Sequence, residues 1–202
     1  MKSGKDISIL DYTGKKRISL LDEVEGHKRY IEPFGGSFTA GLNLLKDGYQ
    51  GDVIFNDLDK EVYDFWNRVK SGIEILETDK FYLKHRGEKG ITNNTLNKLQ
   101  KNVELMQSVE LYNKDAFELI QEYDSEDTYM FIDPPYISGS GCYKYGVDTD
   151  KLCRIIQNLK CDWLLTYDNN RYIIELYKNC EIIEQTRVLF GQKYTELFIR
   201  RG

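Results

Sequence analysis

The sequence contains few prolines, histidines and cysteines, and it has no long apolar run. No stretch approaches the roughly 18 consecutive apolar residues that span a bilayer. No signal-peptide core follows the basic start at residues 1–5, so we expect a cytoplasmic protein without a membrane partner. The four cysteines form no CxxC pair, and His27 and His85 are far apart. This pattern predicts reduced thiols and no metal site.

Positive charge is also in deficit, because the formal net charge of the 202 residues is -5. This balance argues against a protein that coats nucleic acid through general charge attraction. The length predicts a single domain over residues 1–202 with a core of its own. Basic residues still gather locally in segments 1–17 and 84–101. In the second segment the candidate phosphate contacts are Lys84, Arg86, Lys89 and Lys98, although a solvated helical face would give the same pattern.

Strands and helices are predicted to alternate along the chain. Strands are expected at 30–32, 52–56, 109–112, 129–132 and 163–167, and a closing hairpin at 181–190 and 194–200. Helices are expected at 38–46, 57–70 and 116–123, and two more are expected to begin at Asp148 or Thr149 and at about Asn169. Leu58 is expected on the apolar face of the helix at 57–70. Residues 71–108 are expected to be mostly helical. The order predicts an α/β fold with a mainly parallel sheet, helices on both faces and an antiparallel hairpin at its end.

In such a sheet, ligands bind beyond the carboxyl ends of the strands. Two features follow the first two strands: the turn Glu32-Pro33-Phe34-Gly35-Gly36-Ser37, and Asp57 about 20 residues later. Glycines let backbone and ligand approach closely, and an acid at this spacing can accept hydrogen bonds from both ribose hydroxyls. Together they indicate a nucleotide-type cofactor site. An ordinary strand-to-helix turn and a helix cap would be the structural alternatives.

The third feature is Asp133-Pro134-Pro135-Tyr136, directly after the strand at 129–132. Two prolines in succession restrict the backbone and donate no hydrogen bonds. Asp133 and the Pro134 carbonyl can each accept one N–H of an exocyclic amine, and Tyr136 can stack on a flat base. We therefore predict a site for a nucleobase amine rather than a rigid turn alone.

With the basic turn Tyr12-Thr13-Gly14-Lys15-Lys16, these motifs resemble the Dam-like family of adenine-N6 DNA methyltransferases. The order Tyr-Thr-Gly-x-Lys, Glu-Pro-Phe-Gly-Gly, Asn-Asp and Asp-Pro-Pro-Tyr matches that family. The resemblance implies a Rossmann-like methyltransferase fold with a seven-stranded sheet, S-adenosylmethionine as methyl donor, and DNA with a flipped adenine as substrate. It implies that the catalytic residues are Asp133, Pro134 and Tyr136, and that the cofactor contacts are Tyr12, Lys16, Phe34, Gly36, Asp57 and Asp133.

The sequence departs from the family in two places. Phe38 stands where the family has its second loop glycine, so that the loop is expected to pack differently. Residues 71–108 form only a small, reduced target-recognition insert without the family's aromatic and Asn/Arg-rich pattern. A homodimer or a partner chain could therefore assist recognition. Two other functions stay open: methylation of an exocyclic amine in RNA, and a non-catalytic binding module or subunit of a methylase complex.

Overall fold

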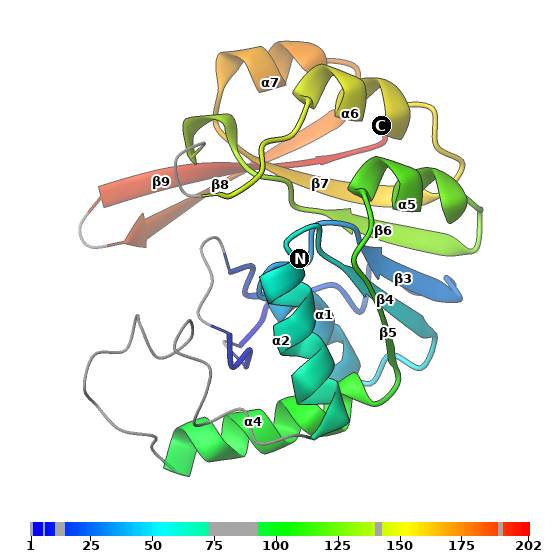
Figure 1. Ribbon diagram of the computed structural model, residues 1–202. Coiled ribbons are helices and arrows are strands. Elements are labelled where there is room, and N and C mark those ends of the chain that lie inside the picture. Colours follow the sequence, from blue (N-terminus) through cyan, green and yellow to red (C-terminus); the bar gives the residue numbers. More distant parts are fainter. Residues whose placement is uncertain (1, 6, 11–14, 73–92, 140–142, 190–191) are drawn as a thin grey trace.

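The computed structural model describes residues 2–5, 7–10, 15–72, 93–139, 143–189 and 192–202, and its element labels are those of Figure 1. The strands are β1 (Lys2–Ser3), β2 (Ile18–Ser19), β3 (Arg29–Glu32), β4 (Asp52–Asn56), β5 (Val109–Tyr112), β6 (Thr128–Ile132), β7 (Asp162–Asp168), β8 (Glu181–Leu189) and β9 (Gln192–Arg200). The helices are α1 (Thr39–Lys46), α2 (Lys60–Ser71), α4 (Asn93–Met106), α5 (Ala116–Glu122), α6 (Thr149–Ile156) and α7 (Arg171–Leu176), with a short 3-10 turn at Ile137–Gly139.

Seven strands form one sheet in the order β5-β4-β3-β6-β7-β9-β8 (Figure 1). The first five of these strands run parallel, and β9 runs antiparallel to both of its neighbours. Numbered along the chain within this sheet, the order is 3-2-1-4-5-7-6. The structure thus confirms the predicted Rossmann-like α/β fold, including the C-terminal antiparallel hairpin.

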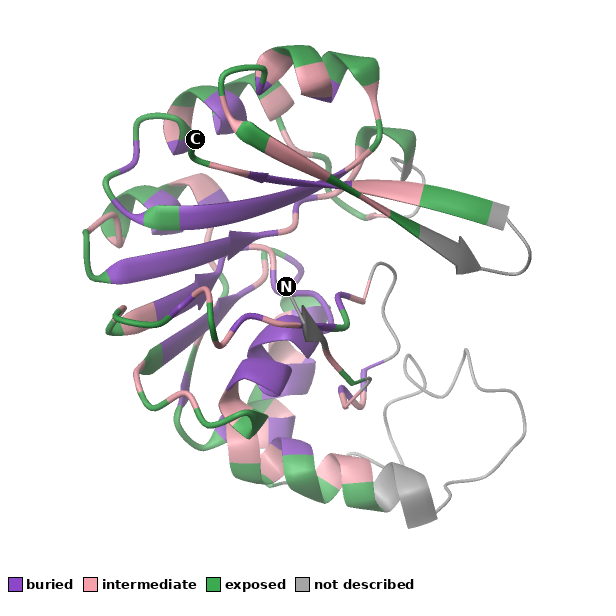
Figure 2. Ribbon diagram, turned by 180° about the vertical axis from the view of Figure 1, so that it is seen from behind, coloured by how far each residue is buried: buried purple, intermediate pink, exposed green. Residues whose placement is uncertain are grey.

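Each central strand buries side chains on both faces of the sheet. Tyr30, Val53 and Tyr129 belong to one core cluster, which includes the buried faces of α1 and α2. The next residue of each strand belongs to a second cluster, which includes α5, α6 and α7. Because successive side chains of a strand point to opposite faces, this sheet needs apolar residues at every position. The purple central strands of Figure 2 show this burial directly.

The helix predicted at 57–70 begins three residues later than expected. Asp59 is its N-cap and accepts a hydrogen bond from the Glu61 amide at 3.0 Å, so helical geometry starts at Lys60. Leu58 precedes this cap and is 45% exposed, so its assignment to the apolar face of the helix was wrong. The predicted face otherwise holds, since Val62, Phe65, Trp66 and Val69 are all buried.

Of the region 71–108, the structure describes residues 71–72 and the segment from 93 onwards. Helix α4 lies against α1 and α2, and the Asn102 side chain joins it to the N-terminal segment. The Asn102 amide donates to the Ile7 carbonyl at 2.9 Å and accepts from the Ile9 amide at 2.8 Å. Among the described residues, no helix is both long enough and apolar enough to cross a membrane.

Candidate methyl-transfer site

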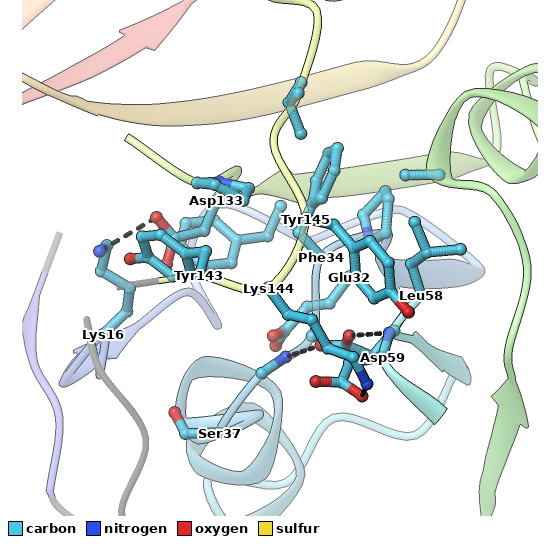
Figure 3. A pocket seen from close by; sticks show the side chains of 18 of the residues that line it. Lys16, Glu32, Phe34, Ser37, Leu58, Asp59, Asp133, Tyr143, Lys144 and Tyr145 are labelled. Atoms are coloured by element: carbon cyan, nitrogen blue, oxygen red, sulfur yellow. Dashed lines mark hydrogen bonds and ion pairs between the residues drawn. The ribbon is translucent and has the colours of Figure 1, made fainter. Parts of the chain in front are cut away.

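A cavity with an empty volume of about 930 Å³ lies at the carboxyl ends of the parallel strands (Figure 3). Its position follows from the topology. Strands β3 and β6 are neighbours in the sheet, but the chain proceeds from β3 in one direction and from β6 in the other. Loops that leave such a pair diverge and open a crevice. The loop after β3 carries the glycine turn, and the loop after β6 carries Asp133, so both predicted motifs meet here.

The glycine turn is shaped by Phe38, which has a left-handed conformation with φ 48°. A Cβ atom on Gly35 would lie 1.2 Å from the Phe38 ring, so only glycine fits there. The ring stacks on Phe55 with centroids 4.1 Å apart and lies 5.2 Å from Trp66. The Phe38 ring therefore fills the space beneath the turn and packs it against β4 and α2.

Asp57 braces this turn with both of its carboxylate oxygens. Oδ2 accepts from the Gly36 amide and Oδ1 accepts from the Asp59 amide, both at 2.8 Å. Burial raises the pKa of Asp57 to about 6, and the two amide hydrogen bonds oppose that rise. Each oxygen retains acceptor capacity, because a carboxylate oxygen carries two lone pairs. Asp57 can thus support the turn and accept a ligand hydroxyl.

Glu32 is a buried carboxyl at the floor of the cavity, 3% exposed. Its Oε1 accepts from the Tyr30 hydroxyl at 2.9 Å and from the Gly41 amide at 2.6 Å. Gly41 must be glycine, since its Cβ would lie 2.3 Å from the Phe55 ring. Burial raises the pKa of Glu32 to about 8, against the opposing effect of these two hydrogen bonds.

The remaining wall consists of residues to which the sequence assigns no catalytic or cofactor role. Asp115 and Phe117 line the cavity where α5 begins, and the Asp115 carboxylate accepts from the Phe117 amide at 2.8 Å. Residues 143–147 also line the cavity, and Lys144 forms an ion pair with Asp59 at 3.2 Å. Figure 3 shows Tyr143 on the side of Asp133, and Tyr145 on the side of Leu58. The sequence marks Asp115 as an acid directly after a parallel strand, at the edge where ligands bind, whereas residues 143–147 carry no motif.

At the other end of the cavity, Asp133 belongs to a compact polar network. Its Oδ1 accepts from the Thr166 hydroxyl at 2.5 Å and lies 3.0 Å from the Lys16 ammonium. Its second oxygen, Oδ2, can accept a hydrogen bond from a ligand, because a carboxylate oxygen carries two lone pairs. Burial raises the pKa of Asp133, while Lys16 and Thr166 act to lower it.

Lys16 and Tyr136 both meet Glu196 of β9, which sequence reasoning left outside the site. The Lys16 ammonium lies 3.0 Å from Glu196 Oε1, and the Tyr136 hydroxyl donates to the same oxygen at 2.6 Å. The ring centroids of Tyr136 and Tyr167 are 5.6 Å apart, and the Lys16 ammonium lies 4.9 Å from the centroid of the Tyr136 ring. Burial raises the pKa of the Tyr136 phenol well above its usual range.

The structure brings most of the predicted site residues together. Lys16, Phe34, Gly36, Asp57 and Asp133 line the cavity, and Tyr136 adjoins it through Glu196 and Lys16. The Pro134 ring is buried beside them. Lys98 is placed apart from them, on helix α4. Tyr12, Lys84, Arg86 and Lys89 lie outside the described residues.

The cavity is rich in carboxyl groups and poor in cations. It is lined by Glu32, Asp57, Asp59, Asp115 and Asp133, against Lys16 and Lys144. Apolar surface is provided by Phe34, Leu58 and Phe117. This combination suits a ligand that carries positive charge, hydroxyl groups and a flat apolar part. No group of three or more possible metal-ligating side chains occurs within the part of the chain that is described.

No protein-family model matches the chain, and a comparison with curated proteins gives no match. Solved structures of similar fold include a protein provisionally named the methyltransferase yhhF from Escherichia coli, at 14% identity and a TM-score of 0.48, covering 91% of this chain and 82% of that one. Another, provisionally named the RNA methyltransferase PH1948, is from Pyrococcus horikoshii, at 12% identity and a TM-score of 0.49, covering 89% and 74%. The tRNA methyltransferase TrmK from B. subtilis is 11% identical with a TM-score of 0.46, covering 91% and 64%.

Proposed function

We propose that this protein is an S-adenosylmethionine-dependent methyltransferase that methylates the N6 amine of adenine in DNA. One observation carries the proposal: Asp133, from the predicted base-binding motif, lies in the same cavity as the glycine turn and Asp57. A donor and an acceptor that enter from these two loops would meet at Asp133. Residues 1–202 would form the catalytic domain.

The donor fits the wall between Gly36 and Phe117. Asp57 can accept the ribose hydroxyls, and the apolar surface of Leu58 and Phe117 can hold the adenine ring. When bound, the donor supplies a methyl group on a positively charged sulfonium sulfur. The carboxyl-rich lining favours that charge.

The acceptor fits the other end. A base inside a duplex cannot reach a cavity of this kind, so that the target adenine must be flipped out. Asp133 Oδ2 and the Pro134 carbonyl would accept the two hydrogens of the amine and favour lone-pair density on its nitrogen. Tyr136, which does not line the donor cavity, would offer its ring to a base that arrives from outside. Orientation and the negative charge of Asp133 would then supply most of the catalysis.

The experiment is a transfer assay with tritiated methyl donor and unmethylated DNA, followed by mass spectrometry of the product nucleosides. We expect N6-methyladenine from the wild type and none from Asp133→Ala, with the variant's fold verified by circular dichroism. Donor binding without transfer to any nucleic acid would contradict the proposal and favour a binding module, assisted by a partner chain or a second copy.

RNA is the second candidate acceptor. The Asp-Pro-Pro-Tyr motif suits any exocyclic amine on a flat base, and Asp133 offers the same acceptor oxygen to an adenine or a guanine of RNA. Ribosomal and transfer RNA are therefore assayed beside DNA under equal salt, because phosphate contacts depend steeply on salt. Methylation of RNA alone would replace DNA in the proposal and leave the site roles unchanged.

A further inference from the structure

The Lys16 ammonium is shared between two carboxylates that come from distant parts of the chain. Asp133 follows β6 and Glu196 lies on β9, and each has an oxygen 3.0 Å from the same nitrogen. Lys16 is 5% exposed, so that water does little to screen these charges. Lys16, Asp133 and Glu196 together carry a net charge of -1 when all three are ionised.

The sharing of the Lys16 ammonium affects the basicity of Asp133. If the buried ammonium were paired with Asp133 alone, it would hold the Asp133 carboxylate strongly in its ionised form. Such a carboxylate is a poor acceptor for a further proton. Glu196 opposes this effect by its own negative charge and by pairing with the same ammonium. The Asp133 carboxylate therefore keeps basicity that a simple ion pair would remove.

Glu196 also fixes the aromatic ring beside the acceptor site. The Tyr136 hydroxyl donates to Glu196 Oε1 at 2.6 Å, and its ring packs against Tyr167. The ring is thus restrained at its hydroxyl and along one side. An aromatic ring restrained in this way loses less freedom when a base stacks on it.

We propose that Glu196 is a positioning residue for methyl transfer, which tunes Asp133 as proton acceptor through Lys16 and holds the ring of Tyr136 for the target base. The inference rests on the proposed function. As the N–C bond forms and the S–C bond breaks, the sulfonium becomes a neutral thioether and the amine nitrogen becomes positive. That nitrogen then loses one proton to Asp133 Oδ2, and the proton passes from Asp133 to water.

Other titratable groups also face Asp133 and set the background of its titration. Glu32 of β3 is a further carboxyl that interacts with Asp133 electrostatically. Among the described residues, the phenols of Tyr30, Tyr136 and Tyr167 also interact with Asp133. Asp168 lies opposite Glu196 in the pairing of β7 with β9. These groups are identical in the variants compared below, apart from the residue changed.

The test compares Glu196→Gln with Tyr136→Phe across pH. Glutamine still accepts the Tyr136 hydrogen bond but removes the charge, whereas phenylalanine removes the hydrogen bond and keeps Glu196. For Glu196→Gln we expect the acidic limb of the kcat profile to move down by about half a pH unit or more. The plateau of kcat falls, and KM for the nucleic acid stays within about twofold. For Tyr136→Phe we expect an unshifted limb and a raised KM for the nucleic acid.

A second readout does not depend on activity. The carboxyl carbon of Asp133 is titrated by ¹³C NMR in the donor-free protein, with its signal assigned from Asp133→Asn. Glu196→Gln is expected to move this midpoint to lower pH. An unmoved midpoint and limb in a folded, active Glu196→Gln protein would overturn the inference and leave the proposed function intact. Absence of methyl transfer by the wild type would overturn both.

Discussion

Replacing Glu32 by glutamine should stabilise the protein at neutral pH, although Glu32 makes two hydrogen bonds. Its pKa is about 8 in the folded chain against an ordinary value of 4.5. Between these values the folded protein holds a proton that the unfolded chain has released. The free energy of unfolding therefore falls as pH rises through this window, by about 1.4 kcal/mol for each pH unit.

Glutamine removes this dependence because it does not titrate. Its amide oxygen can accept from the Tyr30 hydroxyl and the Gly41 amide, as Oε1 of Glu32 does. The pKa of Asp57 is about 6 and affects stability with the same sign. Asp57 is present in both proteins, so its contribution cancels in their comparison between pH 6 and 7. From pH 6 to 7, the free energy of unfolding of the wild type should fall by about 1.4 kcal/mol more than that of Glu32→Gln.

Urea unfolding at a series of pH values from 5.5 to 8 measures the difference, with intrinsic tryptophan fluorescence as the signal. Glu126→Gln is the matched control, because Glu126 is exposed on a loop, and it should keep the wild-type slope. Parallel pH dependences for the wild type and Glu32→Gln would refute the assignment of a buried carboxyl that stays protonated at neutral pH.

Three further predictions concern the donor side of the cavity. Asp57→Ala leaves the amides of Gly36 and Asp59 without their acceptor, so calorimetry should show donor affinity reduced by about tenfold or more; unchanged affinity would count against Asp57. Gly35→Ala forces the Phe38 ring out of its packing and should lower the free energy of unfolding by about 1–3 kcal/mol. Gly146→Ala is the control, because its added Cβ meets no heavy atom within 4 Å, and it should change this free energy by less than about 0.5 kcal/mol. At pH 7, binding of the sulfonium donor should release more protons than binding of its demethylated thioether, because the positive charge of the sulfonium lowers the pKa of Glu32. Calorimetry in two buffers of different ionisation enthalpy measures the number of protons released. Equal release for the two ligands would contradict the prediction.

Sequence reasoning placed the elements of the sheet well because their signals are local. The strand at 52–56 was predicted with the bounds that the structure gives, and the hairpin followed from two β-rich runs around Gly191. Leu58 was misplaced for an equally local reason: apolar periodicity continues across a cap, and only the hydrogen bond from Glu61 to Asp59 shows where the helix begins.

In the glycine turn at residues 32–37, the sequence predicted the turn itself but not the packing beneath it. The order of residues from Glu32 to Ser37 indicated a glycine turn, and the departure at Phe38 was visible in the sequence. The packing of that ring against Phe55 and Trp66 was not visible, since the three residues belong to different elements. Their contact depends on how α1 and α2 lie on one face of the sheet.

By itself, the sequence determined the alternation of strands and helices and the residues that end the strands at Glu32, Asn56 and Ile132. It could therefore predict that the two motifs share an edge of the sheet. Only the tertiary structure decided that β3 and β6 are neighbours, and that Lys16 and Glu196 meet beside Asp133. The physical reason is that burial and pairing of charges join residues separated by up to 180 positions, and no local pattern in a chain records which distant carboxylate will share an ammonium.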